Sequence, residues 1–384
     1  MRPRATTGAD AVVVGGGIVG CAVAWALASR GARVTLLERN GRLCLEASNA
    51  AAGMLAPLSE ADEPGPLLDF SLQALAAYPR AVDDVQSVTG IDVEFRRTGI
   101  LRVALSESEE EALRRRVAWQ RDAGLELYEL DAALLHELEP RLTPRARFGV
   151  LCPDEGQVSN QQMTLALARA AEARGARILT RSPVTGLRVA GGRVRAVRTP
   201  AGDVQGDRFV FAAGAWTGLI SRLLRRVAPP RPIRGQMIAL GGMVTPIRTI
   251  VWGPRGYLVP RANGLVFAGA TVEDVGFRRR TTVAGLRRVR RMAEELVPQL
   301  RAAAEPFSWY GFRPGSPDGL PIIGVVPGLD NAIVATGHYR NGILLGPLTG
   351  LLVAELALTG QTPSALAAFA PARFTQAATS AAPS

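Results

Sequence analysis

Apolar positions near the N-terminus fall into a strand–helix–strand pattern. Residues 12–14 form a run of valines typical of a strand, and three glycines follow it directly. An uncharged apolar stretch up to residue 28 predicts a buried helix, and residues 32–38 predict a second strand. These segments indicate a βαβ unit with a glycine-rich turn between its first strand and its helix.

A signal peptide or a membrane span is the alternative interpretation of residues 11–28, because arginines precede this stretch. Its β-branched start favours a strand instead, and glycine costs about 1 kcal/mol per residue inside a helix. The second strand also follows at once. We therefore favour the βαβ unit.

Helical and strand patterns alternate along the rest of the chain. Periodicity predicts helices over 67–89, 107–123, 131–139, 163–174 and 281–301, and an apolar helix within 337–358. Strands are predicted as a pair within 95–105, as a meander with a Gly-Gly turn over 177–199, over 207–216, throughout 229–275, and on both sides of a Pro/Gly loop over 309–324. Pro347, Thr349 and Glu355 interrupt the last helix, which argues against a membrane span.

The glycine-rich turn has the spacing Gly15-x-Gly17-x-x-Gly20. The first glycine permits the tight turn, the second lets the backbone approach a pyrophosphate, and the third lets helix and strand pack closely. The helix N-terminus offers N–H groups to phosphates, and the carboxylate of Glu38 can accept hydrogen bonds from a ribose diol. The pattern predicts an adenine-dinucleotide site without distinguishing NAD from FAD.

Composition excludes several kinds of chemistry. All 45 basic residues are arginine, so no Schiff-base or P-loop lysine is present. The two histidines, His136 and His338, are too few for a histidine-rich metal site. Cys21, Cys44 and Cys152 form no Cys-x-x-Cys pair, which argues against structural zinc and a disulfide framework and favours a reducing cytoplasm.

The length of 384 residues corresponds to two or three domains at roughly 150 residues each. The net charge is +11, but the arginines are scattered in short runs, so we interpret them as a solvated surface rather than a nucleic-acid site. Small residues over 41–57 and near 212–215 would allow a backbone to approach a flat ligand closely. An ordinary alanine-rich helix start explains the first of these segments equally well.

Several sequence blocks, in this order, resemble the FAD-dependent amino-acid oxidases of the D-amino-acid oxidase type, and especially the glycine oxidase group of thiamine biosynthesis. The blocks are GGGIVG, ASNAAAGML, FVFAAGAW, IRGQ, GYLVPR, GFRPGSPDGLPIIG and GHYRNGILLGP. They extend over residues 12–349, and the last two are the most specific.

The resemblance implies an α/β fold in which an FAD-binding Rossmann-like βαβ domain is interleaved with an α+β substrate domain. The substrate domain would be an antiparallel sheet with helices on one side. The FAD-binding domain would comprise residues 1–85, 150–225 and 310–384, and the substrate domain residues 86–149 and 226–309. Composition predicts a disordered tail at 375–384.

The resemblance further implies FAD held without a covalent bond, because the sequence around Cys44 is unlike a flavin-attachment site. Ile18 and Val19 would contact the pyrophosphate, Glu38 and Arg39 the adenosine, and the loop 338–344 the isoalloxazine ring. The full set of implied cofactor-binding residues is Gly15, Gly17, Ile18, Val19, Gly20, Glu38, Arg39, Ser48, Ala52, Gly53, Met54, Val184, His338, Tyr339, Arg340, Asn341, Gly342, Ile343 and Leu344.

By the same resemblance, the enzyme would oxidise glycine, with sarcosine and small D-amino acids as alternative substrates. A hydride would pass from Cα to flavin N5, the imine would hydrolyse to glyoxylate and ammonia or supply the thiamine thiazole, and oxygen would give hydrogen peroxide. Arg313 and Tyr257 would bind the substrate carboxylate, Arg340 would lie over the active site, and Met54 would border the pocket. The two arginines would lower the pKa of the substrate amine, and His338 would be a packing residue rather than a base.

Two residues near these blocks differ from what the group leads us to expect, and both are expected to flank the pocket: Arg255 and Val272. A dehydrogenase of the same fold with an acceptor other than oxygen is the alternative function. A non-catalytic FAD-binding protein is a third interpretation. The expected partners are a small amino acid and oxygen, in a cytoplasmic homo-oligomer without metal, nucleic acid or membrane.

Overall fold

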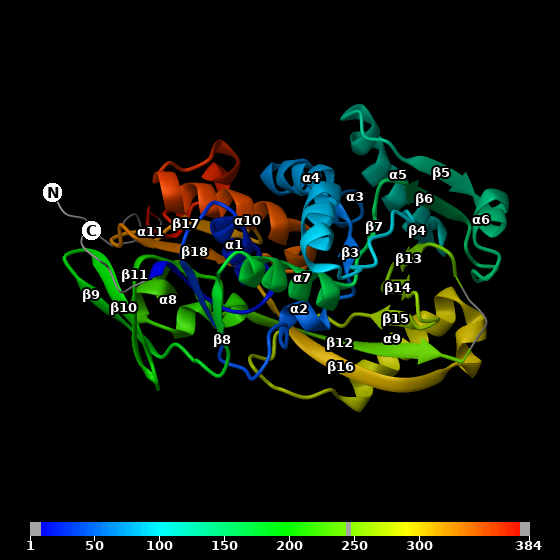
Figure 1. The fold of residues 1–384 in the computed structure, drawn as a ribbon. Helices are drawn as coiled ribbons and strands as arrows, with labels where there is room; N and C mark the ends of the chain where they lie inside the picture. Colours follow the sequence, from blue (N-terminus) through cyan, green and yellow to red (C-terminus); the bar gives the residue numbers. More distant parts are fainter. Residues whose placement is uncertain (1–8, 243–246, 377–384) are drawn as a thin grey trace, which may run out of the picture.

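The computed structural model describes residues 9–242 and 247–376, which form two lobes side by side (Figure 1). The first lobe is built on a mostly parallel sheet with the order β17-β18-β11-β1-β2-β8. The central strand β1 pairs in parallel with β2 and β11, as a βαβ unit requires. Its strands are β1 (Ala9–Val14), β2 (Val34–Leu37), β8 (Arg177–Leu179), β11 (Gly202–Phe211), β17 (Ile322–Val325) and β18 (Ala332–Thr336).

The predicted meander over 177–199 is wrong at its first strand. The hairpin β9 (Gly186–Ala190) and β10 (Arg193–Thr199) turns at the two glycines and adds to β11 in antiparallel fashion. β8, however, pairs in parallel with β2. There the half-buried Ile178 lies beside the buried Leu36, and these apolar side chains keep β8 at the edge of the parallel sheet.

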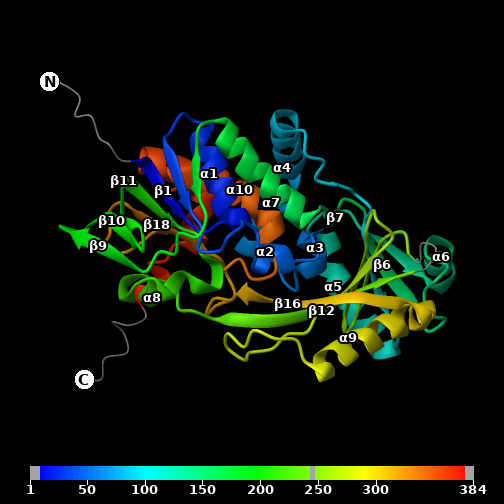
Figure 2. The same ribbon diagram turned by 60° about the horizontal axis from the view of Figure 1, so that its bottom comes forward.

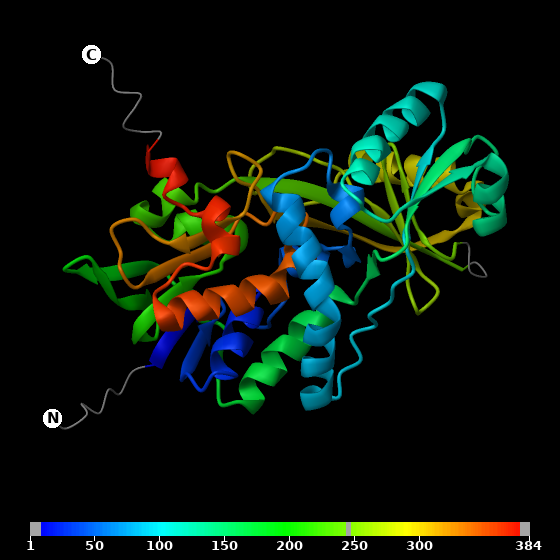
Figure 3. The ribbon, with the colours of Figure 1, turned by 90° about the horizontal axis from the view of Figure 1, so that it is seen from above.

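Four helices cover one face of this sheet (Figure 3): α1 (Ile18–Ala28), α4 (Pro66–Thr89), α7 (Asn160–Ala173) and α10 (Gly342–Thr359). Every residue of α1 is buried, which explains why its sequence is apolar on all sides. The helix α10 is long and apolar enough to cross a membrane, but 61% of it is buried inside the protein, where it packs on α1 and α4. It is therefore a core helix of this lobe.

The second lobe contains a sheet with the order β16-β12-β15-β14-β13-β4-β6-β5, antiparallel except for the pair β13 and β4. Two of its strands, β12 and β16, are long and reach across to the first lobe (Figure 2). The strands are β4 (Ile100–Ala104), β5 (Tyr128–Asp131), β6 (Phe148–Cys152), β12 (Pro232–Gly241), β13 (Ile250–Gly253), β14 (Gly256–Pro260), β15 (Val266–Gly269) and β16 (Ala304–Pro314).

Helices pack on both faces of this second sheet, so the expectation of helices on one side is wrong. Leu135 of α6 (Ala132–Leu138) and Val289 of α9 (Val283–Leu296) share a core with Leu101 on one face. On the opposite face, Val117 of α5 (Glu107–Asp122) packs with Phe148. Both faces of these strands carry apolar side chains, so helices pack on each face and bury them.

Other elements differ from the sequence pattern in detail. The strand pair expected within 95–105 is the single strand β4, preceded by an isolated bridge between Arg96 and Gln157. The helix expected over 281–301 ends at Leu296, and the 3₁₀ turn η2 (Pro298–Ala302) follows, because Pro298 cannot continue the helical hydrogen bonds. The expected domain limits at 150 and 310 fall inside β6 and β16, and those limits stay predictions.

Short elements join the two lobes: α2 (Ala47–Ala50), β3 (Met54–Leu55), α3 (Pro57–Glu60) and β7 (Gly156–Gln157). After β11 come the 3₁₀ turn η1 (Gly214–Leu219) and α8 (Arg222–Val227). The chain ends with the 3₁₀ turn η3 (Ser364–Phe369) and α11 (Arg373–Gln376). Of the tail expected at 375–384, residues 375 and 376 belong to α11, and the others lie outside the described residues.

Candidate active site

A pocket lies at the carboxyl ends of β1, β2 and β11, where ligands of open α/β sheets bind. The glycine turn forms its floor. Gly15 has a φ of +115°, and a Cβ there would lie 2.5 Å from the Ala212 carbonyl oxygen. A Cβ at Gly20 would lie 1.9 Å from the Gly15 carbonyl oxygen, so only glycine lets α1 start this close to the strand.

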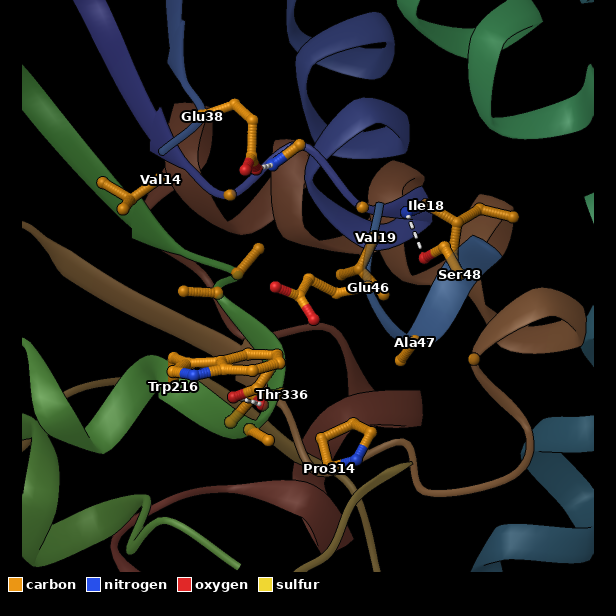
Figure 4. A pocket seen from close by; sticks show the side chains of 18 of the residues that line it. Val14, Ile18, Val19, Glu38, Glu46, Ala47, Ser48, Trp216, Pro314 and Thr336 are labelled. Atoms are coloured by element: carbon orange, nitrogen blue, oxygen red, sulfur yellow. Dashed lines mark hydrogen bonds between the residues drawn. The ribbon is translucent and has the colours of Figure 1, made fainter. Parts of the chain in front are cut away.

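Glu38 ties the turn to the end of β2 (Figure 4). Its carboxylate is buried, and its Oε2 accepts a hydrogen bond of 2.7 Å from the Gly16 N–H. Its Oε1 accepts one of 2.8 Å from the Asn40 N–H. Each carboxylate oxygen can accept a second hydrogen bond, so Glu38 is positioned to hold the turn and a ribose diol at once.

Ser48 supports the start of α1 from the neighbouring segment. The Ile18 N–H donates a 2.9 Å hydrogen bond to the Ser48 Oγ (Figure 4). The next turn of that segment is fixed by Asn160, whose Nδ2 donates to the carbonyl oxygens of Ser48 at 2.6 Å and Asn49 at 3.0 Å. This anchoring places small residues along the pocket wall, as residues 41–57 led us to expect.

A cluster of aromatic and charged side chains closes the far side of the pocket, and of its members only Arg39 was among the sequence-based expectations. Trp216 lies across the pocket (Figure 4). The Arg39 guanidinium lies 4.0 Å from the centre of its ring. Arg39 and Arg279 both form ion pairs with Glu46, whose side chain points into the pocket. The AGAW sequence indicated close backbone packing there, but nothing in it marked the indole as a wall.

A second, smaller pocket continues from the first into the second lobe, and Tyr339, Arg340 and Ile343 line both. It collects residues from distant parts of the chain. Its lining includes Ala52, Gly53, Met54, Glu60, Gly235, Met237, Tyr257, Phe312, Arg313, Tyr339, Arg340 and Asn341. The residues expected to bind the substrate are thus brought together at the junction of the lobes.

Arg313 lies on β16 and enters this second pocket. Its Nη1 donates a 3.0 Å hydrogen bond to the Thr271 carbonyl oxygen, and no carboxylate forms an ion pair with it among the described residues. Its guanidinium passes over Gly235 on the neighbouring strand, where a Cβ would lie 2.4 Å from the Nη1. The sequence block IRGQ contains Gly235, but only the strand pairing shows that Gly235 makes room for Arg313.

Arg340 differs from Arg313 because it has a counter-charge. Its Nε lies 3.5 Å from a carboxylate oxygen of Glu60, which the sequence-based expectations did not include. Burial alone would lower the pKa of Arg340, but the Glu60 carboxylate and the tyrosines Tyr257 and Tyr339 raise it, and the net shift is upward. Arg340 is therefore a paired cation at the pocket, whereas Arg313 has no ion pair within residues 9–242 and 247–376.

Tyr257 is buried on β14, and its hydroxyl lies 3.9 Å from the sulfur of Met237. Burial lowers the pKa of His338 to about 4, so its imidazole is neutral near pH 7, and its Nε2 lies 3.1 Å from the Thr349 hydroxyl. This geometry agrees with a packing role for His338. The tyrosine hydroxyl, with only a weak sulfur acceptor, is free to donate to a ligand.

Arg261 is a further residue that sequence reasoning missed. Its Nη1 donates to the carbonyl oxygens of Ala52 at 3.4 Å and Val158 at 3.3 Å, and to the Gln157 side chain at 3.0 Å. It thereby holds the segment that carries Gly53 and Met54 against the second lobe. Its place in GYLVPR was visible in the sequence, but its partners lie far away along the chain.

Most of the expected cofactor-binding residues line one of the two pockets. The first pocket contains Gly15, Gly17, Ile18, Val19, Glu38, Arg39, Ser48, Val184, His338, Tyr339, Arg340, Gly342 and Ile343, and the second contains Ala52, Gly53, Met54 and Asn341. Gly20 and Leu344 line neither, since both are buried behind the wall. Arg255 and Val272 were expected to flank the pocket, but both are absent from its lining; Arg255 pairs with Glu295 on the surface, and Val272 is 54% exposed.

Comparison with known proteins agrees with this geometry. The model of the family described as "FAD dependent oxidoreductase" matches residues 10–356. The chain belongs to this family. FAD is accordingly its cofactor. The two joined pockets fit an FAD molecule, since they are lined by the glycine turn, the Glu38 carboxylate and a wall of small residues.

Individual relatives of this FAD-dependent oxidoreductase are similar over nearly its whole length. Glycine oxidase of Geobacillus kaustophilus is 36% identical over 94% of this chain and 96% of its own. The bifunctional protein ThiO/ThiG of Synechocystis is also 36% identical, but this chain spans only 54% of its length. The crystal structure of glycine oxidase from G. kaustophilus superposes with a TM-score of 0.90 at 34% identity, covering 95% of this chain and 98% of that one.

Within the part of the chain that the structure describes, no group of three or more His, Cys, Asp or Glu side chains could hold a metal ion.

The L-proline dehydrogenase of P. horikoshii shares the fold, with a TM-score of 0.86 at 22% identity. The α/β class with an FAD-binding sheet and a second antiparallel sheet is thus confirmed.

Proposed function

We propose that this protein is a glycine oxidase, which uses FAD and oxygen to convert glycine into an imine, with hydrogen peroxide as the second product. The observation that carries the proposal is the unpaired guanidinium of Arg313, beside the free hydroxyl of Tyr257, in a small pocket joined to the FAD pocket. An arginine grips a carboxylate with two parallel hydrogen bonds, and a pocket of this kind selects a small amino acid.

FAD, when bound, supplies the acceptor for the hydride that leaves the substrate carbon. The chain's own residues bind and orient the amine. Arg313 and Tyr257 hold the carboxylate, and Met54 with Met237 limits the space beside it. No side chain is needed as a strong base, which agrees with the neutral, buried His338.

The substrate amine must lose its proton before it reacts, because the lone pair is required. Arg313 favours this loss, since a nearby positive charge disfavours an ammonium group. Glu60 offsets much of the charge of Arg340, so Arg313 supplies most of that effect. Gly342 and Ile343 at the start of α10 line the first pocket, and their N–H groups would favour negative charge on a flavin held there.

The roles assigned to individual residues belong to this proposal, and so does a role in supplying the imine for the thiazole of thiamine. The ThiO/ThiG and glycine oxidase relatives support both. A cytoplasmic homo-oligomer with non-covalent FAD completes the proposal. None of the three cysteines lines either pocket, which supports the absence of a covalent flavin bond.

An anaerobic titration with glycine tests the function directly. The absorbance band of oxidised flavin should bleach as glycine is added, and hydrogen peroxide should form when air is readmitted. Bleaching without peroxide would instead support the dehydrogenase. A yellow protein that glycine leaves unbleached would contradict glycine as substrate and direct the test to sarcosine and small D-amino acids.

A further inference from the structure

A loop of the second lobe, residues 270–282, reaches the wall of the first pocket. It leads from β15 to α9 and extends from the start of α9 toward the first lobe (Figure 2). The ring of Phe277 in this loop lies 5.1 Å from that of Trp216, and Arg279 forms an ion pair with Glu46. Trp216 and Glu46 both line the FAD pocket. We call this loop the strap.

A polar network based on β12 fixes both ends of the strap. The buried Arg234 forms an ion pair of 2.6 Å with Glu273, and its Nη1 donates to the carbonyl oxygen of Arg280 at 2.9 Å. The buried Gln236 donates from its Nε2 to Glu273 at 2.8 Å and accepts from the Thr282 N–H at 2.6 Å. A loop held by buried, charge-assisted hydrogen bonds presents its other side chains in fixed positions.

Phe277 belongs to a cluster of three aromatic rings around Trp216. Its ring centre lies 5.5 Å from that of the buried Phe312 on β16, and Phe312 meets the Trp216 ring edge-on at 6.0 Å. Rings at these distances attract one another, and Arg39 contacts the same indole from the first lobe. The position of this pocket wall is therefore set by side chains from both lobes.

Arg279 offsets a negative charge that the cofactor would meet. The side chain of Glu46 points into the pocket (Figure 4), and the diphosphate of FAD is itself anionic. A lone carboxylate there would repel the cofactor, but Arg39 and Arg279 both pair with it. Without Arg279, one of the two balancing charges would be lost.

We infer that Phe277 and Arg279 are positioning residues that slow the release of FAD. Phe277 keeps Trp216 across the pocket, and Arg279 offsets the charge of Glu46. Neither residue lines either pocket, so both act through the pocket residues that they contact. The inference goes beyond the proposed function, because retention of the cofactor does not depend on which amine is oxidised.

The rate of FAD release, measured without any substrate, tests the inference. FAD-loaded protein is diluted into a phosphodiesterase that cleaves free FAD and so prevents rebinding, and the rise in flavin fluorescence gives the rate. Phe277→Ala should speed release about tenfold, because the contacts with Trp216 and Phe312 are lost. Phe277→Tyr keeps the ring and should stay within about twofold of the native rate.

Arg279→Ala should speed release about threefold, as expected for the loss of an exposed ion pair. Adding Glu46→Gln to this variant should return the rate to the native value or below it, because the repelling charge is removed as well. The same addition should not rescue Phe277→Ala. Arg278→Ala is the matched control, since Arg278 is the exposed neighbour of Arg279 in the strap, and it should change the rate less than about twofold.

Three results would overturn the inference: native release rates in both Phe277→Ala and Arg279→Ala, no rescue of Arg279→Ala by Glu46→Gln, or an equal acceleration by Arg278→Ala. Variants are compared only when their circular dichroism spectra match, so that a folding defect is not counted as faster release. Because no glycine is present, failure of the proposed oxidation would leave these rates unchanged.

Discussion

Arg313 illustrates how a single residue acquires its properties from neighbours far along the chain. Its guanidinium is one of 45 basic groups in the sequence, and others, such as those of Arg115 and Arg188, pair with carboxylates on the surface. Gly235 leaves space for it, and the Thr271 carbonyl oxygen holds one of its nitrogens. The remaining N–H groups can therefore be directed at a substrate carboxylate.

Replacing Arg313 tests this role. Arg313→Ala should lower kcat/KM for glycine at least about 100-fold, because two charge-assisted hydrogen bonds of about 1.5–3 kcal/mol each are lost. Arg313→Lys should recover only part of the loss, since lysine keeps the charge without the paired geometry. Steady-state peroxide production measures both. Arg255→Ala, at an exposed arginine outside the pockets, is the control and should change kcat/KM less than about twofold; an equal effect would contradict the carboxylate role.

Glu155 is a buried carboxyl group whose pKa lies above its ordinary value. Burial raises its pKa to about 7, although hydrogen bonds from Ser59 and Leu58 act in the opposite direction. The folded state thus keeps the proton that the unfolded state releases near pH 4.5. Stability from this group is complete below pH 4.5 and is lost as the pH rises through about 7.

Comparison with Glu155→Gln measures this loss. The free energy of unfolding of the native protein, relative to the variant, should fall by about 3 kcal/mol between those two pH values. Denaturant unfolding at a series of pH values gives the difference. Glu111→Gln, at an exposed carboxylate, should show no such trend. A relative stability that stays constant with pH would contradict the raised pKa.

At the scale of elements, the junction of β1 and α1 depends on close backbone approach. Gly20 lies where a Cβ would be 1.9 Å from the Gly15 carbonyl oxygen, and neither of these backbone segments can shift without disturbing the sheet. The helix α10 crosses α1 just as closely, since a Cβ at Gly350 would lie 2.6 Å from the Ala22 carbonyl carbon. The floor of the FAD pocket is therefore a packed helix–strand–helix contact.

Gly20→Ala should consequently destabilise the protein by at least about 2 kcal/mol and weaken FAD binding. Thermal unfolding and the flavin content of the purified protein measure the two effects. Gly186→Ala is the matched control, because a Cβ there would meet only the Arg198 Cδ, at an ordinary 3.6 Å. If both variants bound FAD as tightly as the native protein, the close approach would not matter for the cofactor.

Over the whole molecule, the two pockets join the two lobes. The first pocket lies on the parallel sheet, the second lies between that lobe and the strands β12, β14 and β16, and residues of the loop 339–343 line both. The ring of Trp309 on β16 reaches back to the first lobe, where its Nε1 donates to the Ala50 carbonyl oxygen at 3.1 Å. A ligand that fills both pockets therefore contacts both lobes.

FAD should therefore stabilise both lobes together. At a free concentration of 100 times its Kd, FAD should add about 2.7 kcal/mol to the free energy of unfolding of the apoprotein. Hydrogen exchange should slow in β12 and β16 as well as in β1 and α1. NAD, the other dinucleotide compatible with the glycine turn alone, is the control and should produce neither effect. Slower exchange in the first lobe only would contradict a cofactor that spans the junction.

The sequence alone determined the βαβ unit, its glycine turn and Glu38, because the residues involved are near one another along the chain and their spacing carries the information. The blocks that resemble amino-acid oxidases also predicted FAD and the α/β class, and both predictions are confirmed. The individual roles of Arg313, Arg340 and Tyr257 stay predictions. Their meeting in one pocket is what the structure shows.

The tertiary structure alone decided the position of β8, the helices on both faces of the second sheet, and the pairing of Glu60 with Arg340. It also brought Trp216 and Gly235 to the pockets, bound Arg261 to the segment that carries Gly53 and Met54, and placed Arg255 and Val272 outside the pockets. The physical reason is the same in each case. Strand order, the pairing of distant charges and the space beside a side chain depend on contacts between distant segments, and local spacing carries no record of those contacts.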